Sequence, residues 1–297
     1  MTSYPRGFVP DLRRLRPWPT LESSLWRNPD LVEVTYQQLS VLVQSLIGTK
    51  RRRVLYVGCG LGHIALELAR DGHDVTGVEI DAEAIALAHR AARTDPLRRQ
   101  RGDLCYLHGR FPDAVSSGQS YDRVLFCRVL HHLSNPASAI ERARQVLRPR
   151  GKVVCVDFSY DRLGTGGARF LAQSRIRLAD SGRWPSPAGS SLEEELRRVN
   201  KEWHDDHAAE GLNQHRAMLG PLRCQFRVSR LAWHPYLFWD LAASMKVSAE
   251  HERAVALQLR DDEVGQLSSR RQHGVLFSAS GTPVTHNAEV NHPLSAR

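Results

Sequence analysis

The residues best suited to chemistry begin with a glycine-rich turn. Gly58, Gly60 and Gly62 follow a short apolar run and open a helical pattern. Glycines permit a backbone path that a Cβ would obstruct, and they let a ligand touch the main chain at the positive end of a helix. Glu79 follows at the end of the next apolar run, where a carboxylate can accept hydrogen bonds from both hydroxyls of a ribose. The turn and the acid together predict a ligand that contains adenosine.

The glycine spacing decides between two classes of adenosine ligand. The dinucleotide fingerprint needs a small residue three places after its second glycine. Here that place is taken by His63, which is not small, and Ile64 follows it. The spacing therefore does not favour NAD.

Candidate proton acceptors fall in two regions. His131 and His132 follow the fourth predicted strand, and Asp157 follows in the fifth, at the edge where doubly wound sheets carry their active sites. His204 and His207 are three residues apart in a helical pattern, so we expect them to share a face, which suits a proton relay or a metal. A clear third ligand is missing, so we predict no metal site. The alternatives are packing beside the cofactor for the first pair and a solvated helix face for the second.

The elements that position these residues form an α/β pattern. Residues 51–160 alternate short β-branched runs with helix-period segments, as in βαβ units that wind a parallel sheet. We predict strands over 54–57, 74–78, 104–108, 123–127 and 153–158, followed by two more over 226–233 and 273–280. Asn135 and Pro136 provide a helix N-cap and first helical position.

The segments around this core predict additions to it. Residues 1–50 contain an amphipathic helix over 31–46 preceded by Trp18 and Trp26, and we interpret them as a lid or an extension pinned to the domain. Residues 161–221 are expected to form a helical cap insertion. Residues 222–282 would complete the sheet, and residues 283–297 would be a polar, flexible tail.

Four sequence blocks in order resemble the motifs of the class I S-adenosylmethionine-dependent methyltransferases. They are Val57-Gly58-Cys59-Gly60-Leu61-Gly62, Gly77-Val78-Glu79-Ile80-Asp81, Tyr121-Asp122-Arg123-Val124-Leu125-Phe126-Cys127 and Leu147-Arg148-Pro149-Arg150-Gly151-Lys152-Val153. The resemblance covers residues 51–160 closely and extends weakly to the strands near 226 and 275. It implies a doubly wound, Rossmann-like sheet of seven strands whose last strand is antiparallel.

The resemblance also implies roles for individual residues toward S-adenosylmethionine. Gly58, Cys59, Gly60 and Gly62 would contact the methionyl moiety, Glu79 the ribose and Ile80 the adenine face. Cys127 would offer its main-chain carbonyl to the methionyl ammonium. Arg110 stands where the family often has an aspartate for the adenine amino group, so adenine recognition would pass to backbone groups or to Phe111.

Composition narrows the choice of partner. The formal net charge of +9 invites a nucleic-acid partner, because clustered cations release counterions from phosphates. Nearly all of this charge is arginine, however, and lysine occurs only at Lys50, Lys152, Lys201 and Lys246. No membrane span or signal peptide is evident, so we expect a cytoplasmic protein.

We therefore expect methyl transfer to a small-molecule acceptor, at oxygen first and at nitrogen or carbon next. The bulky insertion suits a small ligand better than a nucleic-acid duplex. RNA methylation and a non-catalytic or repurposed protein that binds the cofactor remain alternatives, and a homodimer is left open.

Overall fold

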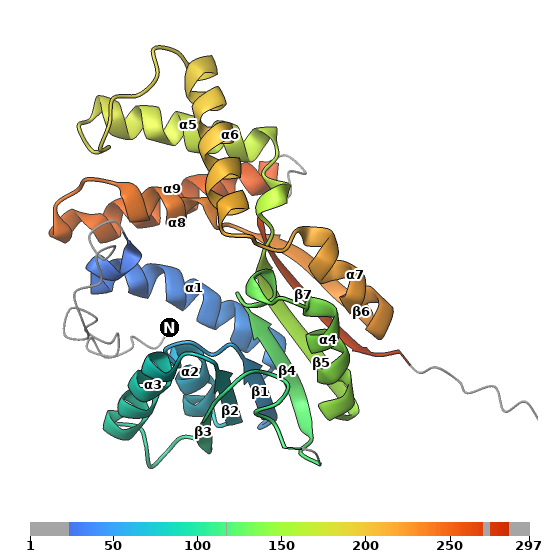
Figure 1. Ribbon diagram of the computed structural model, residues 1–297. Helices are drawn as coiled ribbons and strands as arrows, with labels where there is room; N and C mark the ends of the chain where they lie inside the picture. The colour runs from blue at the N-terminus through green and yellow to red at the C-terminus, as the bar shows by residue number, and fades with distance from the viewer. Residues whose placement is uncertain (1–23, 117, 270–273, 285–297) are drawn as a thin grey trace, which may run out of the picture.

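The protein is built on one twisted sheet. The computed structural model describes residues 24–116, 118–269 and 274–284, so Trp18 and His273 lie outside the described residues. Its seven strands stand in the order β3-β2-β1-β4-β5-β7-β6 (Figure 1). All strands run parallel except β7, which is antiparallel to both β5 and β6. This arrangement confirms the predicted Rossmann-like sheet with an antiparallel last strand.

The strands follow the predicted apolar runs, with shifts of up to three residues at their ends except in β5, which begins six residues earlier than predicted. They are β1 (Arg53–Val57), β2 (Asp74–Glu79), β3 (Leu104–His108), β4 (Tyr121–Cys127), β5 (Leu147–Phe158), β6 (Phe226–His234) and β7 (Leu276–Pro283). The last strand begins and ends three residues later than predicted. The predicted tail from residue 283 thus starts inside β7, and residues 285–297 are outside the described chain.

Side chains of the central strands alternate between two hydrophobic cores, as the period of two in a strand requires. In β1, Val54 and Tyr56 face one core, while Leu55 and Val57 face the other. Burial on both faces explains why these runs are continuously apolar rather than alternating.

Helices cover both faces of the sheet. In chain order they are α1 (Pro29–Ile47), α2 (His63–Arg70), α3 (Ala82–Thr94), α4 (Pro136–Val146), α5 (Thr165–Asp180), α6 (Leu192–Ala209), α7 (His215–Gln225), α8 (Leu237–Ser244) and α9 (Ala249–Ser269), with single turns η2 (Leu25–Arg27), η3 (Leu130–His132) and η4 (Tyr160–Arg162). The predicted N-cap is confirmed, because Asn135 Oδ1 accepts from Ser138 N at 2.9 Å. Helix α1 lies between α9 and α2 (Figure 1).

The insertion after β5 divides differently from the expected 161–221. Helices α5 and α6 pack on each other and project above α8 and α9 (Figure 1). Helix α7 runs past residue 221 and packs instead against α4, beside the sheet. The expected boundary therefore cuts a helix that belongs to the layer covering β5 and β7.

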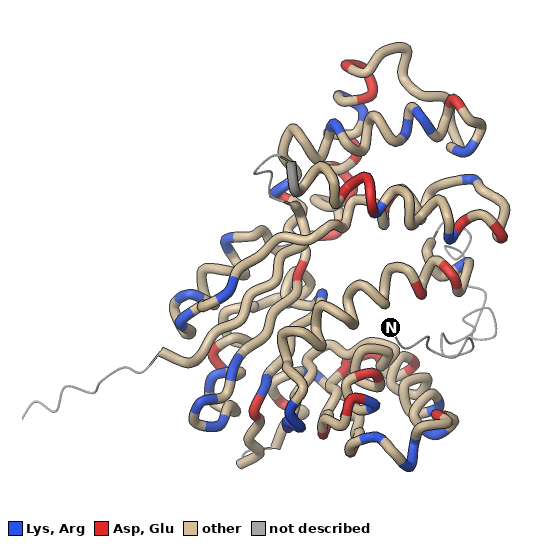
Figure 2. Tube along the Cα trace, turned by 180° about the vertical axis from the view of Figure 1, so that it is seen from behind, with Lys and Arg blue, Asp and Glu red and all other residues tan. Residues whose placement is uncertain are grey.

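Charged residues of both signs are interleaved along most elements (Figure 2). Within the described residues, no helix combines the length and apolar character needed to cross a bilayer.

Candidate functional site

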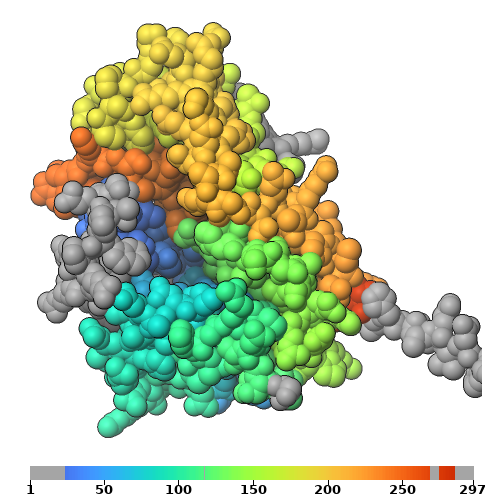
Figure 3. All heavy atoms as spheres, viewed as in Figure 1, coloured from blue at the N-terminus to red at the C-terminus, as the bar shows by residue number. Residues whose placement is uncertain are grey.

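A cleft of about 660 Å³ lies at the carboxyl ends of the central strands. Helix α1 forms one side of it, the turn after β1 forms its floor, and η3 and the start of α4 form another side. Figure 3 shows the hollow between α1, the segment after β1 and the segment around η3. This is the edge where ligands bind in doubly wound sheets.

The glycine turn requires its glycines for different reasons. Gly58, Gly60 and Gly62 have φ values of 68°, 52° and 78°, which disfavour any side chain. A Cβ on Gly58 would lie 2.3 Å from Val129 Cγ2, and one on Gly62 would lie 2.5 Å from the Tyr106 hydroxyl. A Cβ on Gly60 would meet nothing within 4 Å. Gly60 therefore leaves open space on the cleft side, whereas Gly62 is a packing position outside the residues that line the cleft.

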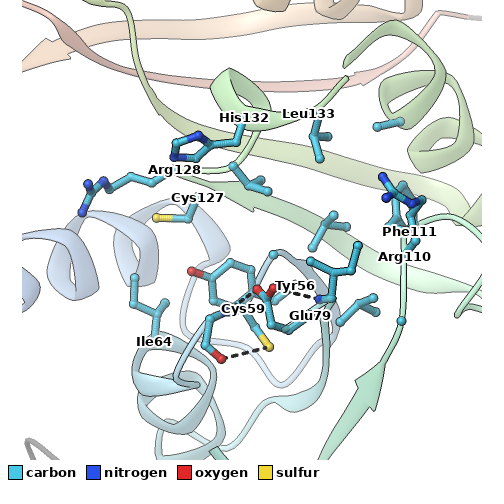
Figure 4. A pocket seen from close by; sticks show the side chains of 18 of the residues that line it. Tyr56, Cys59, Ile64, Glu79, Arg110, Phe111, Cys127, Arg128, His132 and Leu133 are labelled. Atoms are coloured by element: carbon cyan, nitrogen blue, oxygen red, sulfur yellow. Dashed lines mark hydrogen bonds between the residues drawn. The ribbon is translucent and has the colours of Figure 1, made fainter. Parts of the chain in front are cut away.

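Glu79 ties the second strand to this turn. Its Oε2 accepts from Gly60 N at 2.9 Å, and its Oε1 accepts from Ile80 N at 2.8 Å and from Asp81 N at 3.1 Å. Figure 4 shows the carboxylate beside Cys59 and Tyr56 at the cleft floor. The next side chain, Ile80, is 54 % exposed in the cleft. An exposed aliphatic side chain beside a carboxylate suits a ligand that has a flat apolar part and adjoining hydroxyls.

The two cysteines of the site are not suited to be nucleophiles. Burial raises the pKa of the Cys127 thiol to about 12 and also raises that of Cys59. Thiolates are the reactive form of cysteine, so neither side chain is activated. Cys127 lines the cleft at the end of β4, where its main chain is available.

Arg110 and Phe111 form the rim near the ends of β2 and β3. Phe111 stands edge-on to Phe126, with ring centroids 6.3 Å apart. Figure 4 places Arg110 and Phe111 together on one side of the cleft, across from Arg128. Both residues thus lie where the resemblance put adenine recognition, without an acid at position 110.

His131 and Asp157 form a buried pair rather than an open base. Asp157 has no exposed surface, and its Oδ1 lies 2.5 Å from His131 Nδ1. The same carboxylate accepts from Leu130 N at 2.8 Å and from Phe158 N at 2.7 Å. Asp157 is therefore committed to holding the turn after β4, and neither member of the pair is among the cleft-lining residues.

His132 presents its side chain to the cleft instead. The residue is exposed there and its ring centroid lies 4.1 Å from that of His131. Surrounding protein atoms, and secondarily His131, lower the pKa of His132 to about 4. Its imidazole is neutral near pH 7 and can accept a proton.

His204 and His207 have different surroundings, although both lie on α6. His204 is exposed, whereas His207 packs among Phe158, Tyr160 and Trp203. His207 Nδ1 donates to the Trp203 carbonyl at 2.6 Å, which leaves Nε2 as the acceptor of the neutral ring. The two side chains differ in exposure because one face of α6 packs on the end of β5.

Two cleft residues carried no recognisable sequence signal. Tyr36 on α1 lines the cleft and packs against Trp26, His63 and Trp239 with centroid distances of 5.2, 5.5 and 6.0 Å. Trp26 also packs edge-on against His63 of α2, with ring centroids 5.5 Å apart, and so joins the extension to the core. Arg128, directly after Cys127, also lines the cleft.

The comparisons with known proteins agree with this geometry. Residues 55–155 match the family model described as "Methyltransferase domain". Curated relatives include the ubiquinone biosynthesis O-methyltransferase of Alkalilimnicola ehrlichii, 28 % identical over 44 % of this chain and 54 % of that protein. Another is the enzyme of the same name from Serratia proteamaculans, 30 % identical over 39 % of this chain and 46 % of the relative. The chain spans about half the length of the curated relatives it matches.

A solved structure shares the fold. The geranyl diphosphate C-methyltransferase of Streptomyces coelicolor A3(2) aligns with a TM-score of 0.54 at 13 % identity, covering 86 % of this chain and 79 % of that one. Together with the fold and the cleft, the family model identifies residues 55–155 as a class I S-adenosylmethionine-dependent methyltransferase domain.

Proposed function

We propose that the protein methylates a small-molecule acceptor, at oxygen first and at nitrogen or carbon next. The observation that carries the proposal is the hydrogen bond from Gly60 N to Glu79 beside the open face of Gly60. This hydrogen bond holds the glycine turn and the Glu79 side chain together beside a space that a Cβ on residue 60 would occupy. S-adenosylmethionine, when bound, supplies an electrophilic methyl group on a sulfonium. The relatives that carry the name O-methyltransferase support oxygen as the first candidate.

Different residues of the chain would hold different parts of the donor. The main chain at Gly58, Cys59 and Gly60 would receive the methionyl part, and the carboxylate of Glu79 would receive the ribose hydroxyls. Ile80 would lie against adenine. The carbonyl of Cys127 would accept from the methionyl ammonium, and the rim of Arg110 and Phe111 would close the adenine end.

Titration calorimetry with S-adenosylmethionine and S-adenosylhomocysteine tests the assignment, followed by an acceptor screen that measures methyl incorporation. Micromolar binding with turnover of a small acceptor is the expected result. Binding without turnover of any acceptor would favour a non-catalytic role, and turnover of RNA with salt-dependent RNA binding would favour the nucleic-acid alternative. No binding of either ligand would overturn the proposal.

Two glycine variants distinguish a position that leaves room for the ligand from one that is needed for packing. Gly60→Ala adds a methyl group to open space in the cleft, so we expect about a tenfold or greater loss of S-adenosylhomocysteine affinity with a cost in stability of about 1 kcal/mol from the positive φ. Gly58→Ala drives a Cβ into Val129, so its stability should fall by about 1–3 kcal/mol more. Calorimetry and urea unfolding measure the two effects. Equal affinity of Gly60→Ala and the unmodified protein would remove Gly60 from the donor site.

His132 is our candidate for the proton acceptor. We expect His132→Gln to lower kcat by roughly 10²-fold or more, as loss of a general base does. Because its pKa is lowered to about 4, the imidazole is neutral at higher pH, so activity should fall only as pH drops through about 4. An ordinary histidine would lose activity near 6.5. His204→Gln, an exposed change on α6, is the control and should leave kcat unchanged; the same result for His132→Gln would exclude a base at this position.

A further inference from the structure

Arg128 stands at the end of β4 in a strained backbone conformation. Its φ is +55°, in the left-handed region that a non-glycine residue enters at a cost on the order of 1 kcal/mol. Its N–H donates to the Val156 carbonyl at 2.8 Å, which holds the residue in that conformation. A strained backbone beside a cleft suggests a functional role, because many surrounding contacts are needed to hold the residue in that conformation.

The guanidinium group of Arg128 is partly buried and makes no close ion pair among the described residues. It lies 4.8 Å from the ring centroid of Trp239 and 5.6 Å from that of Tyr236, both on or next to α8. Nη2 donates to the Tyr236 hydroxyl at 3.3 Å, and the buried Nε has no acceptor. Throughout residues 24–116, 118–269 and 274–284, no carboxylate lies within ion-pair distance of it. A partly buried guanidinium whose Nε lacks an acceptor is costly, and an anionic ligand in the cleft would supply the missing partner.

The donors that remain suit an anionic group with two acceptor oxygens, such as a carboxylate. A guanidinium carries five N–H donors in a planar fork, and the described structure uses one of them. Two parallel donors of such a fork bind a carboxylate. Stacking on Trp239 fixes the plane of the fork in advance, which lowers the entropic cost of binding.

A largely buried cluster of aromatic side chains continues from Arg128 toward the cap. We call Trp239, Tyr236, Phe158 and His207 the aromatic wall. Successive ring centroids along it are 5.0, 4.8 and 5.2 Å apart. The wall belongs to α8, β5 and α6 and lies outside the loops that would hold the donor's adenosine. The wall supports the guanidinium group of Arg128 from behind, and none of its four residues lines the cleft.

We propose that Arg128 binds a carboxylate of the methyl acceptor. The inference rests on the proposed function and names its substrate class. Arg128 and His132 both line the cleft, so one molecule can reach both side chains (Figure 4). In the same view the guanidinium points away from Glu79, toward α1. The competing source of a carboxylate is the amino-acid end of the donor itself.

The first arm of the test separates these two sources. S-adenosylhomocysteine carries the amino-acid carboxylate, whereas methylthioadenosine lacks it. Both are titrated into the unmodified protein, Arg128→Gln and Arg128→Lys. We expect Arg128→Gln to bind each nucleoside within about threefold of the unmodified protein, a difference below 1 kcal/mol. A loss of about tenfold or more for S-adenosylhomocysteine alone would assign Arg128 to the donor and overturn the proposal.

The second arm uses naphthoate and naphthamide as probes, an acid and a neutral amide of the same size, added to the complex with S-adenosylhomocysteine. Quenching of tryptophan fluorescence reports binding. We expect the acid to bind about tenfold or more tightly than the amide, and Arg128→Gln to abolish the difference, as loss of a charged hydrogen bond does. Arg128→Lys keeps the charge without the fork and should retain part of the preference.

Two negative outcomes are distinguishable. If S-adenosylhomocysteine fails to bind the unmodified protein, the proposed function falls and this inference falls with it. If S-adenosylhomocysteine binds but naphthoate binds no better than naphthamide, only the assignment of Arg128 is overturned. Unfolding midpoints of both variants are measured alongside, and the retained binding of methylthioadenosine shows that the cleft is intact.

Discussion

Replacing Glu79 by alanine is expected to weaken the binding of S-adenosylmethionine and S-adenosylhomocysteine by roughly 100-fold. Hydrogen bonds to a charged group contribute about 1.5–3 kcal/mol each, and the carboxylate would accept two from the ribose. Their loss, partly offset by water, corresponds to about 3 kcal/mol, or two decades in Kd. The variant also removes the acceptor of Gly60 N, so the turn loses a restraint. Calorimetric titration at constant pH and salt measures the change.

Two further variants show whether the charge or the fold is responsible. Glu79→Gln keeps one acceptor oxygen and most of the shape, so its affinity should fall between those of Glu79→Ala and the unmodified protein. Asp81→Ala removes a nearby acid that caps α3 through Glu83 N at 2.8 Å. It should cost about 1 kcal/mol of stability and leave affinity unchanged. If Glu79→Ala binds as well as Asp81→Ala, the acidic residue does not hold the ribose.

The sequence predicted the sheet because each central strand is specified by short-range pattern. Val54 and Leu55 belong to opposite cores, and a strand buried on both sides must be apolar at every position. The glycine turn and its acidic partner could also be predicted from the sequence, since Gly58, Gly60 and Glu79 lie at the ends of two adjacent parallel strands. Both features depend on residues that are near in sequence or on neighbouring strands.

The parts that escaped prediction depend on contacts between distant segments. His204 and His207 have the spacing of one helix face, yet packing on Phe158 and Tyr160 partly buries His207 and leaves His204 exposed. Asp157 reads as an available base until its backbone partners are known. Arg128 becomes notable only when α8 brings Trp239 beneath it. None of these pairings has a local signature.

The attachment of α1 is expected to depend on one buried ion pair. Arg27 Nε donates to Glu252 Oε1 at 2.7 Å, with 16 % and 5 % of the two side chains exposed. The guanidinium also donates to the carbonyls of Ala242 and Ala243, at the end of α8. Asn28 Nδ2 donates to the other oxygen of Glu252 at 2.6 Å. This network joins η2 and α1 to α8 and α9.

We expect Arg27→Met to lower the free energy of unfolding by about 3–5 kcal/mol, because it leaves the carboxylate of Glu252 buried without its cation. Arg27→Met combined with Glu252→Leu removes both charges and should recover most of that loss. Urea unfolding of the two single variants and the double variant gives the coupling energy.

Arg253→Met is the matched control, since it breaks a neighbouring pair with Glu33 whose side chains are each 37 % exposed. Exposed pairs contribute about 0–1 kcal/mol, so a similar loss for both arginines would show that burial is not what makes Arg27 important. The ion pair also bears on the site, because α1 carries Tyr36 into the cleft and α8 carries Trp239 beneath Arg128. Arg27→Met should therefore weaken S-adenosylhomocysteine binding at temperatures where the sheet is still folded, whereas Arg253→Met should not. Unchanged binding in Arg27→Met would mean that the cleft keeps its shape without the buried anchor.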